Sequence, residues 1–193
     1  MREKIFMIIF VLILGSILTT ALVAVDGFTT PYIEKNSLLK LKTSVLNSFD
    51  IPHGSTAEEV EAIFSENIEV REKGERNYYV SRENDIAFQF TGAGLWGPIT
   101  GVISLRPDVT TIKKITVIHQ EETPGLGGRI AEQQYLSGFA DKIFSPALVM
   151  VPEGKSSENT EIDAITGATM SSNAFIEILN SQYRDFSRAV QGE

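Results

Sequence analysis

A long apolar segment near the N-terminus constrains this chain more than any other feature. Residues 5–25 contain no Asp, Glu, Lys or Arg. About 20 apolar residues in a helix cross a hydrocarbon core of about 30 Å, and a helix pairs its own backbone groups there. The alternative is a cleaved signal peptide, whose apolar region is usually about 7–15 residues long. The length of the run favours a retained transmembrane helix, and residues 1–27 form the first predicted segment.

The charges that flank this segment predict its orientation. Arg2 and Lys4 precede it, whereas Asp26 and Glu34 follow it. Basic residues are enriched on the cytoplasmic side of membrane helices. We therefore expect a single-pass protein of the cytoplasmic (inner) membrane. Its N-terminus would lie inside, its helix in the lipid bilayer and the rest of the chain on the extracytoplasmic side.

Composition excludes several classes of function. The chain has no cysteine, which rules out disulfides, thiolate metal sites and thiol nucleophiles, and it has only two histidines. We therefore predict no metal site. Its 17 Lys and Arg against 25 Asp and Glu give a formal charge of −8, and nucleic-acid binding needs clustered cations. Neither a Gly-x-Ser-x-Gly elbow nor a P-loop occurs, and no residue is assigned a catalytic role.

The part between the apolar segment and residue 67 has helical patterning. Pro31 is typical of a helix start, so we expect a break there and a second helix over residues 32–49. Thr56, with Glu59 three residues later, forms a capping box that opens a short helix. Residues 28–67 are thus predicted to be a helical stalk with packing helices.

The remaining part, residues 68–193, is predicted to be one domain. Short β-branched and aromatic runs predict an antiparallel sheet of five strands, at residues 68–70, 78–80, 86–90, 99–105 and 112–118. Further patterns indicate a short helix, a strand, a polar loop and an amphipathic C-terminal helix, at residues 130–136, 146–151, 153–161 and about 172–189. The predicted fold class is α+β: one transmembrane helix followed by a domain with an antiparallel sheet and flanking helices.

The sequence DAITGAT, residues 163–169, stands just before the C-terminal helix. Gly167 and Ala168 leave the backbone accessible, and several hydroxyl side chains gather beside the helix start. A helix N-terminus presents unpaired N–H groups and a partial positive charge, which can bind a phosphate. The alternative is that Ser171 or Ser172 simply caps the helix. The residues alone favour the cap, because capping is the commoner use of such hydroxyls.

Two glycine-rich segments precede this motif, at residues 91–98 and 119–128. In the second, Pro124 with its neighbouring glycines predicts a rigid turn that could supply N–H groups to the edge of an aromatic cofactor. A tight connection between a strand and a helix would need the same residues. In the first, Trp96 either packs on a cofactor or belongs to the core.

The C-terminal motif resembles that of a known family. Asp163, Thr166, Gly167, Ala168 and Thr169 match the pattern Asp-x-x-Ser/Thr-Gly-Ala-Thr, the flavinylation motif of the FMN-binding subunits of Rnf and NQR complexes. In that family a flavin transferase, using FAD and Mg²⁺, joins FMN through a phosphodiester to the last threonine. The resemblance implies covalent FMN on Thr169.

The glycine-rich segments agree with this resemblance. The run from His119 through Glu122 to Gly127 looks like the signature that lies beside the flavin in the family, and Leu95 with Trp96 is similar to the NQR branch. The residues that the resemblance implies for FMN binding are Leu95, Trp96, Glu122, Thr123, Pro124, Gly125, Leu126, Gly127, Asp163, Thr166, Gly167, Ala168 and Thr169.

The resemblance also implies a function. The chain would be an electron-relay subunit of a redox-driven, ion-translocating oxidoreductase, not catalytic alone, with the other membrane subunits and the flavin transferase as partners. Its length favours the Rnf type, which couples ferredoxin with NAD⁺. The Leu95–Trp96 pair favours the alternative, the equivalent subunit (NqrC type) of a Na⁺-translocating NADH:quinone oxidoreductase. A flavin-free, membrane-anchored assembly subunit is a further alternative.

Overall fold

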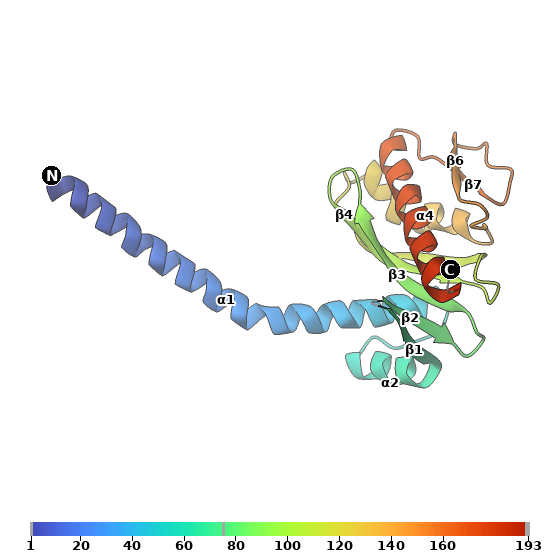
Figure 1. Ribbon diagram of the computed structural model, residues 1–193, viewed down its shortest axis with the longest axis horizontal. Helices are drawn as coiled ribbons and strands as arrows, with labels where there is room; N and C mark the ends of the chain where they lie inside the picture. The colour runs from blue at the N-terminus through green and yellow to red at the C-terminus, as the bar shows by residue number, and fades with distance from the viewer. Residues whose placement is uncertain (1, 75, 192–193) are drawn as a thin grey trace. The chain divides into compact units, whose positions relative to one another are not determined.

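The structure, a computed structural model, describes residues 2–74 and 76–191 (Figure 1). Its contacts divide the chain into two compact units, one up to Leu39 and one from Lys40 onward. The first unit is helical, and the second contains the sheets and all of the candidate site residues.

The helix α1, Arg2–Ser48, contains all of the described residues of the first unit. It is the one helix among the described residues that is long and apolar enough to cross a membrane, with a mean hydropathy of 2.8 over its most apolar window. The predicted break at Pro31 is wrong, because α1 continues through this residue. A proline removes only one intrahelical hydrogen bond, here to the carbonyl of Gly27, and the bonds of the flanking turns remain.

The predicted α+β fold with an antiparallel sheet of five strands is confirmed in the second unit. Its strands lie in the order β1-β2-β3-β4-β5, each antiparallel to the next. They are β1 Ile68–Lys73, β2 Arg76–Ser81, β3 Ile86–Ala93, β4 Pro98–Leu105 and β5 Ile112–His119. Over residues 88–91 of β3 the buried side chains of Phe88 and Phe90 alternate with the exposed Gln89 and Thr91, as expected where only one face of a strand is covered.

The remaining elements complete the second unit. They are α2 Ala57–Asn67, η1 Gly127–Ala131, α3 Gln133–Leu136, η2 Ser137–Phe139, β6 Val149–Val151, β7 Glu161–Asp163 and α4 Thr169–Gln191. The capping box of Thr56 and Glu59 at the start of α2 is confirmed. Two expectations need correction. The predicted helix over residues 130–136 is divided between η1 and α3, and the predicted loop 153–161 ends in β7, which pairs in parallel with β6.

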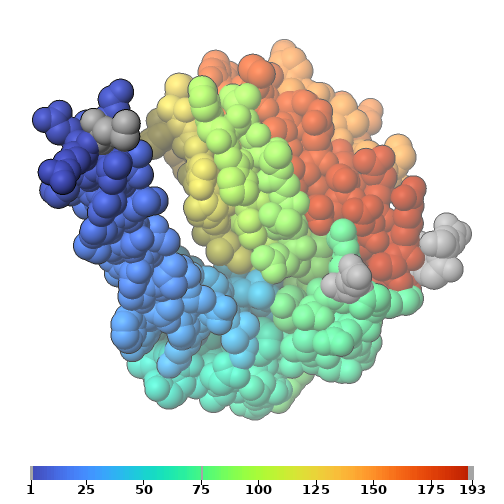
Figure 2. Space-filling view, turned by 60° about the vertical axis from the view of Figure 1, so that its left-hand side comes forward, coloured from blue at the N-terminus to red at the C-terminus, as the bar shows by residue number. Residues whose placement is uncertain are grey.

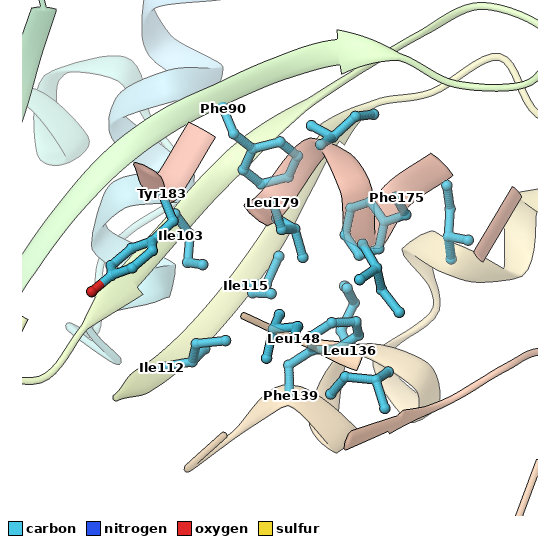
Figure 3. Close-up of a cluster of buried hydrophobic side chains, with 14 of the residues drawn as sticks. Phe90, Ile103, Ile112, Ile115, Leu136, Phe139, Leu148, Phe175, Leu179 and Tyr183 are labelled. Atoms are coloured by element: carbon cyan, nitrogen blue, oxygen red, sulfur yellow. The ribbon is translucent and has the colours of Figure 1, made fainter. Parts of the chain in front are cut away.

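The core lies between the sheet and α4. Phe175, Leu179 and Tyr183 of α4 point toward the sheet and toward the segment that follows it (Figure 3). Phe175 is fully buried and meets Phe90 of β3 edge to face, with ring centroids 5.9 Å apart. Burial of a side chain of this size contributes about 1.5–3 kcal/mol. Figure 2 shows the surfaces of the β3–β4 hairpin and α4 side by side.

The last turns of α1 belong to this second unit. Val45 and Leu46 are fully buried there. The hydroxyl of Ser104 on β4 donates a hydrogen bond of 2.6 Å to the carbonyl oxygen of Ser48. The base of the β3–β4 hairpin is therefore fixed to the end of α1, and its tip carries the loop 94–97.

Candidate functional site

The three segments that carry the candidate residues surround one pocket of about 360 Å³. It lies beside the tip of the β3–β4 hairpin and the first turn of α4. The residues that line it are Leu95, Trp96, Thr123, Leu126, Gly127, Gly167, Ala168, Thr169, Met170 and Ser171. Segments that are far apart in the sequence thus meet at one place.

A tight turn brings the C-terminal motif to α4. The N–H of Ala168 donates to the carbonyl oxygen of Ile165 at 2.9 Å, which closes a four-residue turn. Gly167 occupies its third position with φ +81°, as a type II turn requires. The N–H of Thr166 donates to the carboxylate of Glu153 at 3.1 Å, and hydrogen bonds from Thr166 lower the pKa of Glu153. The turn is therefore fixed by its own hydrogen bond and by the one to Glu153.

The helix α4 begins at Thr169, three residues before the predicted start at residue 172. Ala168 takes the N-cap position, because its carbonyl oxygen accepts the first intrahelical hydrogen bond, from the N–H of Ser172. Alanine has no side-chain acceptor for the free N–H groups of the first turn. The interpretation that Ser171 or Ser172 caps the helix is wrong, since both lie inside α4.

The two serine hydroxyls are used elsewhere. Ser172 accepts a hydrogen bond from the N–H of Ile165 and donates to the carbonyl oxygen of Ala168, both at 3.1 Å. Ser171 donates to Glu122 at 2.6 Å. By contrast, the side chain of Thr169 is exposed at the first position of α4 and faces the pocket. The first turn of α4 has no acidic residue, so an anion there would meet the positive end of the helix dipole.

Glu122 joins the three segments by hydrogen bonds to residues that line the pocket. Its side chain is buried, with 3% of the residue exposed. One carboxylate oxygen accepts hydrogen bonds from the N–H groups of Leu95, at 2.7 Å, and Trp96, at 3.2 Å. The other accepts the hydroxyl of Ser171. Glu122 is therefore a buried bridge between the hairpin tip and α4, and it is not among the residues that line the pocket.

The second glycine-rich segment forms the tight turn that its composition predicts. The carbonyl oxygen of Thr123 accepts hydrogen bonds from the N–H of Leu126, at 3.1 Å, and of Gly128, at 3.0 Å. Gly125 has φ +74°, a conformation that favours glycine. The turn places Thr123, Leu126 and Gly127 against the pocket, whereas Pro124 and Gly125 do not line it.

Four apolar side chains around the pocket are exposed. Trp96 is 71% exposed and Met170 is 68% exposed, and Leu95 and Leu126 are also exposed. The interpretation of Trp96 as a core residue is therefore wrong. Met170 was missed by the sequence analysis. Its place in the site follows from the start of α4 at Thr169, because Met170 is then an apolar residue in the exposed first turn of the helix.

Asp163 lies apart from this pocket. Its carboxylate accepts hydrogen bonds from the N–H groups of Lys155, at 3.0 Å, and Ser156, at 2.8 Å. It lines a smaller hollow of about 180 Å³ together with Arg129 and Tyr135. Asp163 thus holds the loop beside the motif, and Thr166 does not line the pocket around Thr169 either.

A further hollow, of about 460 Å³, lies between β2, β3 and α4. Arg76 at its rim is held by Gln182 and Asp185 of α4. It contains none of the motif residues. The arrangement around Thr169 is therefore the candidate site.

Comparison with known proteins agrees with this site. Residues 94–183 match the family model of the FMN-binding domain, and this range includes all of the residues around the pocket. The resemblance to the FMN-binding subunits of Rnf and NQR complexes is confirmed.

Two relatives show the extent of the likeness. The C subunit of the Na⁺-translocating NADH-quinone reductase of Pasteurella multocida is 41% identical over 93 residues, which are 46% of this chain and 36% of that protein. The same subunit of Haemophilus ducreyi is 31% identical over 115 residues, or 55% of this chain and 45% of that protein. The match thus spans less than half of the length of these relatives.

Two solved structures have the same fold. The C subunit of the Na⁺-translocating NADH-quinone reductase of Parabacteroides distasonis aligns with a TM-score of 0.67 at 26% identity, covering 78% of this chain and 90% of that one. NqrC of Shewanella oneidensis aligns with a TM-score of 0.64 at 19% identity, covering 77% of this chain and 91% of that one. The predicted fold, an FMN-binding domain behind an apolar helix, is confirmed.

Proposed function

We propose that this chain is the FMN-carrying electron-relay subunit of a membrane-bound, ion-translocating oxidoreductase of the NQR type, with FMN joined to Thr169. One observation carries the proposal. The hydroxyl of Thr169 is exposed at the first position of a helix of 23 residues, beside a pocket lined by all three segments. The relatives named above are NQR subunits, and this favours the NQR alternative over the Rnf type that the chain length suggested.

The start of α4 fits a phosphate. Ala168 offers no side-chain acceptor at the N-cap position, and Ser171 and Ser172 are bonded to other groups. The first N–H groups of α4 thus have no cap from these side chains. A helix end of this kind stabilises an anion by about 0.3–1 kcal/mol when exposed. A phosphoester on Thr169 would place its charge at this end.

The pocket fits a planar aromatic ring. Its volume of about 360 Å³ lies at the lower end of the range of about 300–1,000 Å³ that is usual for small-molecule sites. Leu95, Trp96, Leu126 and Met170 expose apolar surface around it. A ring that covers these side chains would remove their surface from water, and Trp96 could stack on it.

FMN would supply the electron transfer, whereas the chain would hold the ring and set the charges around it. A covalent bond would keep the cofactor from being lost on the extracytoplasmic side. The apolar span of α1 from Ile5 to Val25 has no charged residue, so this span offers no ionisable group for an ion path. The other subunits of the complex would therefore move the ion.

The attachment is tested by fluorescence under ultraviolet light in a denaturing gel. The full chain and its Thr169→Ala and Thr123→Ala variants would be co-expressed with a flavin transferase. Thr123 is the matched control, because it is an exposed threonine of the same pocket. We expect fluorescent bands for the wild type and Thr123→Ala, and a dark band for Thr169→Ala.

A dark wild-type band beside a fluorescent known substrate of the transferase would contradict the proposal. The chain would then be the flavin-free assembly subunit. Fluorescence that persists in Thr169→Ala would place the flavin on another residue.

The orientation can be tested because the chain has no native cysteine. Single cysteines would be introduced by Glu3→Cys, which retains Arg2 and Lys4, and by Lys155→Cys in an exposed loop. We expect a membrane-impermeant maleimide to label the cysteine at 155 in intact spheroplasts, and the cysteine at 3 only after lysis. The reverse pattern would place the flavin domain in the cytoplasm.

A further inference from the structure

We propose that Glu122 is the positioning residue of the flavin site: it fixes the loop 94–97 to the first turn of α4 and places a buried negative charge behind the pocket. The inference about the charge rests on the proposed function. The inference about position concerns the chain itself and holds with or without a bound flavin.

The hydrogen bonds of Glu122 form the link. Its two oxygens accept from Leu95 and Trp96 on the hairpin tip and from Ser171 on α4, at 2.7, 3.2 and 2.6 Å. Trp96 is bonded at one end of this link, Thr169 lies two residues before Ser171 at the other end, and both line the pocket. Its geometry therefore sets where the exposed indole lies relative to the attachment hydroxyl.

The glycines around Glu122 show how closely this link is packed. A Cβ atom on Gly94 would lie 2.5 Å from one carboxylate oxygen of Glu122, and a Cβ on Gly127 would lie 2.7 Å from the other. Distances under 3.0 Å are essentially never seen for real Cβ atoms. The absence of a side chain at both glycines thus makes room for the carboxylate. This explains why glycine is needed at the two positions, whether or not a cofactor binds.

The same contacts indicate that Glu122 is charged. Two of the three groups that face its oxygens are N–H groups, which can only donate, and the third, the Ser171 hydroxyl, donates to the other oxygen. An ionised carboxylate accepts only, and the N-terminal end of α4 adds a favourable dipole. A negative charge beside the pocket disfavours the addition of an electron to the flavin. Glu122 therefore lowers the reduction potential of the bound FMN.

Trp96 is the single tryptophan of the chain, so its fluorescence reports the position of the loop directly. The first measurement uses the full chain in detergent, made without the flavin transferase. We expect Glu122→Ala to lower the fluorescence anisotropy of Trp96, because the loop loses both of its hydrogen bonds to the carboxylate. Glu122→Gln should retain the wild-type anisotropy, since its amide oxygen can still accept and its NH₂ can donate to Ser171.

The second measurement is the reduction potential of FMN in the loaded protein. Glu122→Gln removes the charge but retains the shape, so we expect a shift to a more positive potential. A merely structural role would leave the potential of this variant unchanged. The control is Glu177→Ala, which removes an exposed carboxylate that accepts from Asn173 on α4. We expect this variant to match the wild type in both measurements.

The two measurements test the two parts of the proposal separately. Wild-type anisotropy in a folded Glu122→Ala would overturn the positioning role, and a wild-type potential in Glu122→Gln would overturn the role of the charge. If Glu122→Ala does not fold, Ser171→Ala replaces it: a lower anisotropy supports the link, and an unchanged one overturns it. If the wild type takes no flavin, the proposed function fails, while the anisotropy still decides the positioning role.

Discussion

Two buried polar groups near the motif, the carboxylate of Glu122 and the hydroxyl of Tyr135, have opposite surroundings. Glu122 has three donors around its carboxylate. The hydroxyl of Tyr135 is also buried, but it has no hydrogen-bond partner among the described residues, and the nearby Ser172 hydroxyl donates to Ala168 instead. A buried polar group without a partner costs about 1–3 kcal/mol. Glu122 therefore organises its surroundings, whereas the hydroxyl of Tyr135 adds nothing to the stability of the fold.

Removal of this hydroxyl tests that difference. We expect Tyr135→Phe to leave the free energy of unfolding at neutral pH unchanged or to raise it. Burial raises the pKa of Tyr135 from 10.0 to about 12. The unfolded chain therefore releases this proton first, and wild-type stability falls as the pH rises from 10.0 to about 12. Urea unfolding across this range should show a smaller fall in Tyr135→Phe, and an equal fall would contradict the assignment.

At the scale of residues, the sequence was informative about types and not about roles. The motif and the glycine-rich turn were recognisable, and Thr169, Thr123 and Gly127 do line one pocket. The bridging position of Glu122 could not be predicted, because it depends on contacts between segments far apart in the chain. Trp96 illustrates the same limit: aromatic residues usually belong to cores, but this side chain lies at an exposed hairpin tip.

Among the elements, α4 determines the chemistry of the site. Its 23 residues begin at Thr169, the proposed attachment residue, and its apolar face packs on β3. The periodicity predicts the helix correctly, but the predicted start lies three residues late, since capping by serine is the commoner arrangement. Here an alanine holds the cap position. A helix that gives up a cap of about 0.5–2 kcal/mol has its N–H groups available for another acceptor.

A cap introduced at this position should oppose flavin binding. We expect Ala168→Ser to raise the free energy of unfolding of the flavin-free protein by up to about 0.5–2 kcal/mol, because the new hydroxyl can accept from the N–H groups of the first turn. Those N–H groups would then be less available to a phosphate, so flavin incorporation should be slower.

Ala174→Ser, inside the same helix, is the control, since it adds a hydroxyl without a cap. The measurements are urea unfolding and the rate of incorporation with excess transferase. Flavin incorporation at the wild-type rate in a stabilised Ala168→Ser would show that the phosphate does not use these N–H groups.

Elements with a local sequence pattern could be predicted, whereas elements that depend on distant parts of the chain could not. The five antiparallel strands could be predicted because each has its own local pattern. The strand β7 is only three residues long, and its pairing with β6 depends on contacts across the chain. The continuation of α1 through Pro31 depends on the whole helix, whereas the expected break rested on one residue.

At the scale of the whole molecule, the chain consists of an apolar helical unit and a folded domain that includes the last turns of the same helix. The boundary between the compact units follows Leu39. The segments 28–67 and 68–193, which were inferred from the sequence pattern, remain a prediction. Val45, Leu46 and Ser48 belong to the second unit, where they are buried, so the boundary between the units lies within α1 and not at its end.

Two truncations distinguish these boundaries. A chain that begins at Lys40 should be soluble and fold, because it retains the buried Val45 and Leu46 and the hydrogen bond from Ser104 to Ser48. A chain that begins at Asp50 loses them, and burial of such side chains contributes about 1.5–3 kcal/mol each. We expect a clearly lower melting temperature for the shorter chain. Equal melting temperatures would show that the last turns of α1 do not stabilise the domain.

The central claim is that FMN is joined to Thr169, and tandem mass spectrometry tests it most directly. The full chain would be purified after co-expression with a flavin transferase, digested, and the peptide that contains Thr166, Thr169, Ser171 and Ser172 fragmented. We predict the mass of FMN less one water on this peptide, with fragment ions that place it on Thr169. An unmodified peptide, or a flavin on one of the other three hydroxyls, would contradict this account.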